Sequence, residues 1–107
     1  MIELREKDRQ QVCRIANEVL PAGVELWAYG SRVKGTGHDT SDLDLAMVSP
    51  EGESVDGEYL TQFRLALQDS TIPIFVQVMD WNHIPESFKE NILQCYEVLC
   101  RVESKDQ

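Results

Sequence analysis

A short polar link between two apolar runs restricts the fold more than any other feature of the sequence. Residues 24–29 (VELWAY) and residues 43–48 (LDLAMV) each have the composition and length of a β-strand. The link that joins them is polar and contains Gly30, Gly35 and Gly37. A crossover helix, which two neighbouring parallel strands would need, hardly fits into such a link. We therefore expect a mixed or largely antiparallel sheet.

The remaining apolar segments predict helices and one more strand. Apolar residues at helical spacing predict helices over residues 2–20 and about residues 60–70, and the branched run at residues 74–79 predicts a third strand. A last helix is expected from about residue 83, and its apolar stripe consists of Phe88, Ile92, Tyr96 and Leu99. Helices that alternate with strands predict an α/β (α+β) fold, a small mixed sheet flanked by helices.

Length and charge limit the class of protein. The 107 residues accommodate one domain, which we expect to span residues 1–107. The formal net charge is −9, from 19 acidic and 10 basic residues. This charge disfavours direct binding to nucleic acid or to an anionic membrane, because both need Lys and Arg to neutralise phosphates. No apolar run approaches the roughly 20 residues of a membrane span, and the first residues lack the apolar segment of a signal peptide.

The three cysteines predict no disulfide framework and no zinc site. Cys13, Cys95 and Cys100 form no C-x-x-C spacing, and neither histidine completes a zinc pattern. We interpret them as reduced thiols, which is typical of a cytoplasmic protein.

Asp42 and Asp44 form the first half of a candidate site. Residues two apart on a strand point to the same face, so these two carboxylates would lie side by side. Such a pair repels itself unless a cation binds to it, and oxygen ligands favour a hard ion such as Mg²⁺ or Mn²⁺. An Asp-x-Asp on its own is more often an exposed strand edge than a metal site.

The turn after residues 24–29 forms the second half. Gly30 allows the backbone to come close to a ligand, and the backbone amides of Ser31 and Arg32 and the Ser31 hydroxyl could bind phosphate oxygens. Arg32 and Lys34 place positive charge there in an otherwise acidic protein. A Gly-Ser turn alone is usually only a turn. Together with the aspartate pair, on a strand–loop–strand segment, it indicates phosphoryl or nucleotidyl transfer.

The pattern of these residues resembles a known signature. Gly30-Ser31-Arg32-x-x-Gly35 followed by Ser41-Asp42-x-Asp44-Leu45 resembles the DNA polymerase β-type nucleotidyltransferases, and most of all their small minimal nucleotidyltransferase (MNT) branch. The likeness extends over nearly the whole chain. It implies the polymerase β-type nucleotidyltransferase fold, with ATP as substrate and Mg²⁺ or Mn²⁺ as cofactor.

The resemblance also implies roles for individual residues. Asp42 and Asp44 would be the catalytic, metal-binding carboxylates. The nucleotide-binding residues would be Gly30, Ser31, Arg32, Lys34, Gly35 and Ser41. Members of this branch often pair with an all-helical HEPN-domain protein, and in several toxin–antitoxin pairs the MNT protein transfers AMP to it.

One position departs from the family pattern. The third strand usually carries a third metal-binding aspartate, and the corresponding residue here is Gln77. A glutamine can offer a neutral carbonyl oxygen to a metal, but it cannot act as a general base. Asp80 is three residues further on, so a regular strand would direct it to the other face.

Two functional hypotheses follow. The chain is either a Mg²⁺-dependent nucleotidyltransferase that moves AMP from ATP to a hydroxyl on a partner protein, or a catalytically weak MNT-type antitoxin that binds nucleotide and acts by binding its partner. Gln77 distinguishes them. The acceptor is expected on another protein, because the elements above account for the donor only, and a homo- or hetero-oligomer is compatible with either hypothesis.

Overall fold

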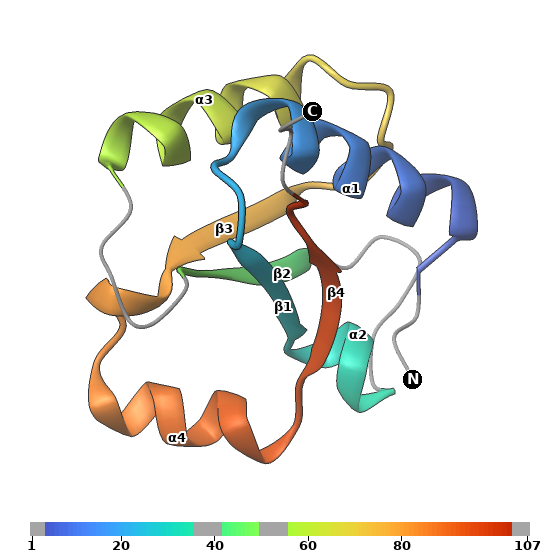
Figure 1. Ribbon diagram of the computed structural model, residues 1–107. Coiled ribbons are helices and arrows are strands. Elements are labelled where there is room, and N and C mark those ends of the chain that lie inside the picture. Colours follow the sequence, from blue (N-terminus) through green and yellow to red (C-terminus); the bar gives the residue numbers. More distant parts are fainter. Residues whose placement is uncertain (1–3, 36–41, 50–55, 104–107) are drawn as a thin grey trace.

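The computed structural model describes residues 4–35, 42–49 and 56–103, and in this part of the chain four strands form one mixed sheet (Figure 1). The strands are β1 (Glu25–Tyr29), β2 (Leu43–Val48), β3 (Val76–Asp80) and β4 (Glu97–Arg101), in the spatial order β3-β2-β1-β4. Strand β1 pairs antiparallel with β2 and β4, whereas β2 and β3 are parallel. The mixed sheet predicted from the short polar link is confirmed.

The helices cover the sheet on both faces. Helices α1 (Glu6–Val19) and α3 (Gly57–Gln68) lie together on one face, and α4 (Glu86–Gln94) lies on the other (Figure 1). The short helix α2 (Ser31–Lys34) follows β1 directly, and the 3₁₀ turn η2 (Trp81–His83) follows β3. Helix α3 provides the crossover between the parallel strands β2 and β3, which the shorter β1–β2 link could not contain.

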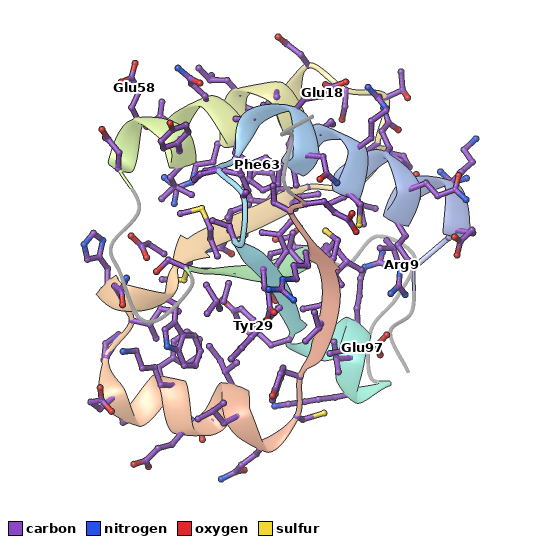
Figure 2. The ribbon with its side chains drawn as sticks, in the orientation of Figure 1. Arg9, Glu18, Tyr29, Glu58, Phe63 and Glu97 are labelled. Carbon is purple, nitrogen blue, oxygen red and sulfur yellow. The ribbon has the colours of Figure 1, made fainter. Side chains whose placement is uncertain are left out.

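Two hydrophobic clusters result from this arrangement. The larger cluster lies between the sheet and helices α1 and α3, and it contains the fully buried Phe63 (Figure 2). The smaller cluster lies under α4 and contains Tyr29, Ala46, Ile84 and Ile92. Tyr29 is the last residue of β1, and its side chain lies on the face of the sheet that α4 covers. It therefore borders the face on which the candidate site is expected (Figure 2).

The predicted last helix is too long, and a strand was missed. Helix α4 ends at Gln94, and residues 97–101 form β4 beside the central strand β1. Leu99 is buried in the larger cluster from this strand, and Tyr96 stacks on Trp27 with ring centroids 4.6 Å apart. The helical spacing of the four apolar residues therefore spans two elements. The second edge of β1 needs a hydrogen-bonding partner, and this tertiary demand overrides the local pattern.

Three smaller features complete the fold. The three cysteines are free thiols, and Cys13 Sγ donates a hydrogen bond to the Leu99 carbonyl at 3.7 Å. On the outer edge of β3, Arg64 of α3 donates from Nη2 to the Val78 carbonyl at 2.6 Å. Within the described ranges, no helix combines the length and the apolar character needed to cross a bilayer.

Candidate nucleotide and metal site

Gly30 and Asp44 define the centre of the candidate site. Asp44 is paired in register with Tyr29, the last residue of β1, and Gly30 follows directly. Gly30 has φ 84° and ψ −157°, a conformation that is essentially restricted to glycine. A Cβ atom at Gly30 would lie 2.5 Å from Asp44 Oδ2. Because glycine has no side chain, the Asp44 carboxylate has room to lie against the turn at Gly30.

The turn continues into helix α2, and no helical turn precedes the first backbone amides of this helix. The amides of Val33 and Lys34 donate to the Gly30 carbonyl at 3.1 and 3.0 Å, so the amides of Ser31 and Arg32 precede the hydrogen bonds of this helix. Gly35 ends α2 in the left-handed conformation, with φ 81°. This part of the predicted nucleotide-binding set is therefore contiguous. Ser41 lies outside the described residues.

Asp42 and Asp44 lie close enough for the charge of one to act on the other, although they line different cavities. Asp42 is exposed immediately before β2, and Asp44 is half-buried within it. Burial, and then the negative charge of Asp42, raises the pKa of Asp44 above the usual range of an aspartate. A bound cation would remove this unfavourable interaction between two carboxylates. The pair thus fits Mg²⁺, which commonly takes one or two protein carboxylates together with substrate phosphates.

Gln77 occupies the position next to Asp44 on the neighbouring strand. The two residues are paired in register on the parallel strands β2 and β3, so their side chains lie on the same face of the sheet, and Gln77 is exposed. Among residues 4–35, 42–49 and 56–103, no three His, Cys, Asp or Glu side chains converge on a possible metal position. The two aspartates thus have a neutral neighbour where a third carboxylate was expected.

Asp80 does not replace the missing carboxylate. Its register partner is Met47, and its side chain is buried with 5% exposure. Its carboxylate accepts a hydrogen bond from the Asn82 amide at 3.0 Å and lies 3.7 Å from His83 Nδ1. Asp80 therefore caps the η2 turn, which accounts for an acidic residue at the end of β3.

A cavity of about 230 Å³ extends from Asp44 toward α4. Gly30, Lys34 and Asp44 line one end, and Tyr29 lines its wall. The other end is lined by four residues of α4: Phe88, Asn91, Ile92 and Cys95, the last at its C-cap. Sequence reasoning did not assign these residues to the nucleotide site, because Phe88 and Ile92 were interpreted as part of an apolar stripe. Their spacing with Asn91 and Cys95 does place all four on one side of the helix.

Two further cavities lie near the aspartates. One, of about 630 Å³, contains Asp42 together with Arg32, which is 7% exposed, and Arg5 from the chain before α1. Arg32 and Lys34, both predicted to bind nucleotide, therefore line different cavities. The other is a groove of about 450 Å³ between α3 and β3 that reaches Gln77 but neither aspartate.

The comparisons with known proteins agree with this geometry. Residues 14–105 match the polymerase beta nucleotidyltransferase family. Over 100 residues the chain is 34% identical to a probable protein adenylyltransferase MntA of Haemophilus influenzae, and the alignment covers 92% of this chain and 83% of that protein.

Solved structures show the same fold. A toxin–antitoxin structure with AMP-PNP superposes with a TM-score of 0.70 at 16% identity, over 91% of this chain and 74% of the other. A structure of a tri-AMPylated Shewanella oneidensis HEPN toxin in complex with MNT antitoxin gives a TM-score of 0.67 at 12% identity, over 92% and 74% of the two chains. Together with the sequence match, the Gly30 turn and the aspartate pair, these findings place the chain in the MNT branch of the polymerase β-type nucleotidyltransferases.

Proposed function

We propose that this protein binds ATP together with Mg²⁺ or Mn²⁺ and transfers AMP to a hydroxyl group of a partner protein. The observation that carries the proposal is the Asp44 carboxylate, which lies beside Asp42 and against the Gly30 turn, with Lys34 lining the same cavity. The relative named adenylyltransferase supports AMP as the transferred group.

The residues of the proposed site fall into two groups: those that would hold the phosphates and those that would hold the metal ion. The Gly30 and Ser31 backbone and the Lys34 ammonium would hold the triphosphate, and Arg32, Gly35 and Ser41 complete the proposed nucleotide-binding set. Asp42 and Asp44 would hold the divalent ion. When bound, this ion would neutralise charge on the phosphate oxygens during transfer.

The proposed reaction is a substitution at the α-phosphorus of ATP. The acceptor hydroxyl oxygen forms a new bond to the α-phosphorus, and the bond between this phosphorus and the bridging oxygen to the β-phosphate breaks. The products are an AMP ester and pyrophosphate. The hydroxyl proton passes to solvent, because the Gln77 amide next to Asp44 cannot accept it.

We propose an all-helical HEPN-type toxin as the partner, with this chain as the antitoxin. Support comes from the related structures, one of which is a tri-AMPylated HEPN toxin in complex with MNT antitoxin.

Gln77 favours a second candidate function. Without a third carboxylate, the ion nearest the attacking hydroxyl would be held weakly, and no base would lie on this face of β3. The protein would then bind nucleotide and partner but transfer AMP slowly or not at all. In this case it acts as an antitoxin by binding.

Titration calorimetry with ATP, in Mg²⁺ and in EDTA, tests the donor site. We expect binding only with the metal, and loss of this binding in Asp42→Asn and Asp44→Asn. The control is Asp69→Asn, which removes one exposed carboxylate at the end of α3 and leaves binding unchanged. Equal affinity for ATP in Mg²⁺ and in EDTA would contradict the metal site.

Transfer of labelled AMP separates the two candidates. The protein is co-expressed with the product of the neighbouring gene, as the candidate HEPN-type partner, and the purified material is incubated with ATP labelled at the α-phosphate. Label on the partner supports the transferase. A stable complex that binds ATP without labelling supports the binding antitoxin, and two separate species in size-exclusion chromatography would contradict the proposed partner.

A further inference from the structure

The cavity between Asp44 and α4 has two chemically different ends. Lys34, Asp44 and the Gly30 backbone form a charged end, whereas the four residues from α4 bring no charge. Phosphates need cations or N–H donors, so they fit only the first end. The second end combines the Phe88 ring, the buried Ile92 side chain and the Asn91 amide, which is the composition of a site for a flat, uncharged group with polar edges.

We propose that the α4 end of this cavity binds the adenine of the donor nucleotide and that Asn91 is a specificity-determining residue that recognises the edge of the base. This inference rests on the proposed function, since it names the nucleoside for the same site. It assigns a role to α4, which the motif residues on β1, α2 and β2 do not include.

The size of the cavity agrees with a nucleoside. Its volume of about 230 Å³ is smaller than the roughly 300–1,000 Å³ of sites that enclose a whole drug-sized ligand. A complete nucleoside triphosphate therefore does not fit inside. The nucleoside fits if the triphosphate extends out of the cavity through its charged end, over Gly30 and Ser31, where the carboxylate pair can hold the ion.

The walls are fixed in place by contacts on the α4 side of the sheet. The rings of Tyr29 and Phe88 meet edge to face, with centroids 5.8 Å apart, and Tyr29 is 8% exposed. The Tyr29 hydroxyl contacts Met79 Sδ at 3.6 Å, which holds the ring against β3. Phe88 remains 36% exposed, so part of its surface is available to pack against a base.

The amide of Asn91 gives the cavity its preference among bases. One primary amide offers a donor and an acceptor side by side, which match the amino group and N7 of adenine in a bidentate pair. Guanine presents two acceptors, N7 and O6, on this edge, so one amide that meets the N7 edge of the base matches adenine and not guanine. Asn91 is exposed on α4 and can meet a ligand without a change in the fold.

Calorimetric titrations with ATP, GTP and inorganic tripolyphosphate, each with Mg²⁺, test the proposal. We expect Asn91→Ala to weaken ATP binding about tenfold, the loss typical of one bidentate contact. Tripolyphosphate affinity should not change, and wild-type protein should prefer ATP to GTP. The matched control is Gln94→Ala, which removes an exposed amide from the same helix outside the cavity and should alter none of these affinities.

The outcomes separate this inference from the proposed function. If wild-type protein binds neither ATP nor tripolyphosphate, the proposed function fails and the inference with it. If ATP binds equally well to wild type and Asn91→Ala, or if GTP binds as well as ATP, the inference alone is wrong. An equal loss of ATP and tripolyphosphate affinity in Asn91→Ala would also overturn it, because the effect would then not act through the base.

Cys95 provides a second, independent readout. Its thiol lines the same end of the cavity and is partly exposed. We expect ATP with Mg²⁺ to slow alkylation of Cys95 by iodoacetamide at least fivefold, and tripolyphosphate to leave the rate unchanged. Mass spectrometry distinguishes Cys95 from Cys13 and Cys100. Equal alkylation rates with and without ATP, in protein shown to bind ATP, would overturn the placement of the base.

Discussion

The carboxylate of Asp44 lies directly against Gly30, with Oδ2 2.5 Å from the point where a Cβ atom would be. A side chain at Gly30 would therefore have to displace the carboxylate or the turn. It would also adopt a backbone conformation that costs of order 1–3 kcal/mol outside glycine. We expect Gly30→Ala to weaken Mn²⁺ binding, measured by electron paramagnetic resonance, at least about tenfold.

Gly35→Ala provides the matched comparison for that variant. Gly35 also has a positive φ, 81°, but no atom of the described residues lies within 4 Å of its Cβ position. It should therefore lose stability through backbone strain, of about 1–2 kcal/mol, while Mn²⁺ affinity stays close to that of wild type. Equal losses of Mn²⁺ affinity in both variants would mean that strain, and not contact with Asp44, governs the site.

Gln77→Asp should raise AMP transfer to the partner at least about tenfold, which corresponds to a barrier lowered by roughly 1.4 kcal/mol. The reason is that position 77 pairs in register with Asp44, so a carboxylate there would face the same ion and could accept the hydroxyl proton. The measurement is the initial rate of labelled AMP transfer in wild type and variant. Rapid transfer by wild type with no change in Gln77→Asp would show that another group supplies the base.

Asp80→Ala is the companion variant. The Asp80 carboxylate accepts a hydrogen bond from the Asn82 backbone amide and is buried away from Gln77. Its loss should therefore lower the melting temperature without changing AMP transfer per folded molecule. A cost of about 1 kcal/mol is typical of a lost capping contact. A specific fall in transfer, with stability unchanged, would assign Asp80 to the reaction instead.

Asp44→Asn should stabilise the metal-free protein at neutral pH. Burial and the charge of Asp42 raise the pKa of Asp44, so the folded state holds its proton more tightly than the unfolded state does. Stability then falls as the pH rises from the usual aspartate value, about 3.9, through the raised value. Because Asp44 remains partly exposed, we expect a gain of only ~1–4 °C in melting temperature at pH 7 in EDTA.

Two conditions check this assignment. Near pH 3 Asp44 is protonated in both states, so wild type and Asp44→Asn should melt together. Saturating Mg²⁺ and ATP should reverse the order at pH 7, since only wild type gains the free energy of ligand binding. A wild type that is more stable than Asp44→Asn in EDTA would contradict the unfavourable charge interaction.

The thiols of Cys13 and Cys100 should differ in reactivity. The Cys100 thiol donates a hydrogen bond to Cys13, and this lowers the pKa of Cys13, while the same bond and then burial raise the pKa of Cys100. Cys13 should therefore be alkylated faster than Cys100 at pH 8, since the thiolate is the reactive form. Cys100→Ala should raise the pKa of Cys13 and slow its alkylation roughly threefold or more, and Cys95→Ala should not.

The centre of the site could be predicted from sequence because it depends on local geometry. Strand alternation places Asp44 on the same face of the sheet as Tyr29, and the glycine before Ser31 has a conformation that other residues rarely adopt. Gln77 could also be placed, because the family pattern fixes its strand, and the register with Asp44 agrees.

The contribution of the C-terminal third could not be predicted in the same way. Whether Tyr96 and Leu99 continue a helix depends on the free edge of β1, which is far away in sequence. The cavity residues Phe88 and Asn91 depend in turn on how α4 lies over Tyr29. Apolar spacing alone does not distinguish a helix face that packs on a core from one that also borders a cavity.

The pairing of β1 with β4 has a consequence for biosynthesis. Leu26 is paired with Cys100, and the Val102 amide donates a hydrogen bond to the Val24 carbonyl at 2.8 Å. Strand β1 therefore pairs along one edge with a strand, β4, that is made late in synthesis. While the ribosome is still making α4, the β1 edge that β4 later covers carries unpaired amides and carbonyls. Nascent chains in this state can pair that edge with another polypeptide, so aggregation competes with folding until β4 has been made.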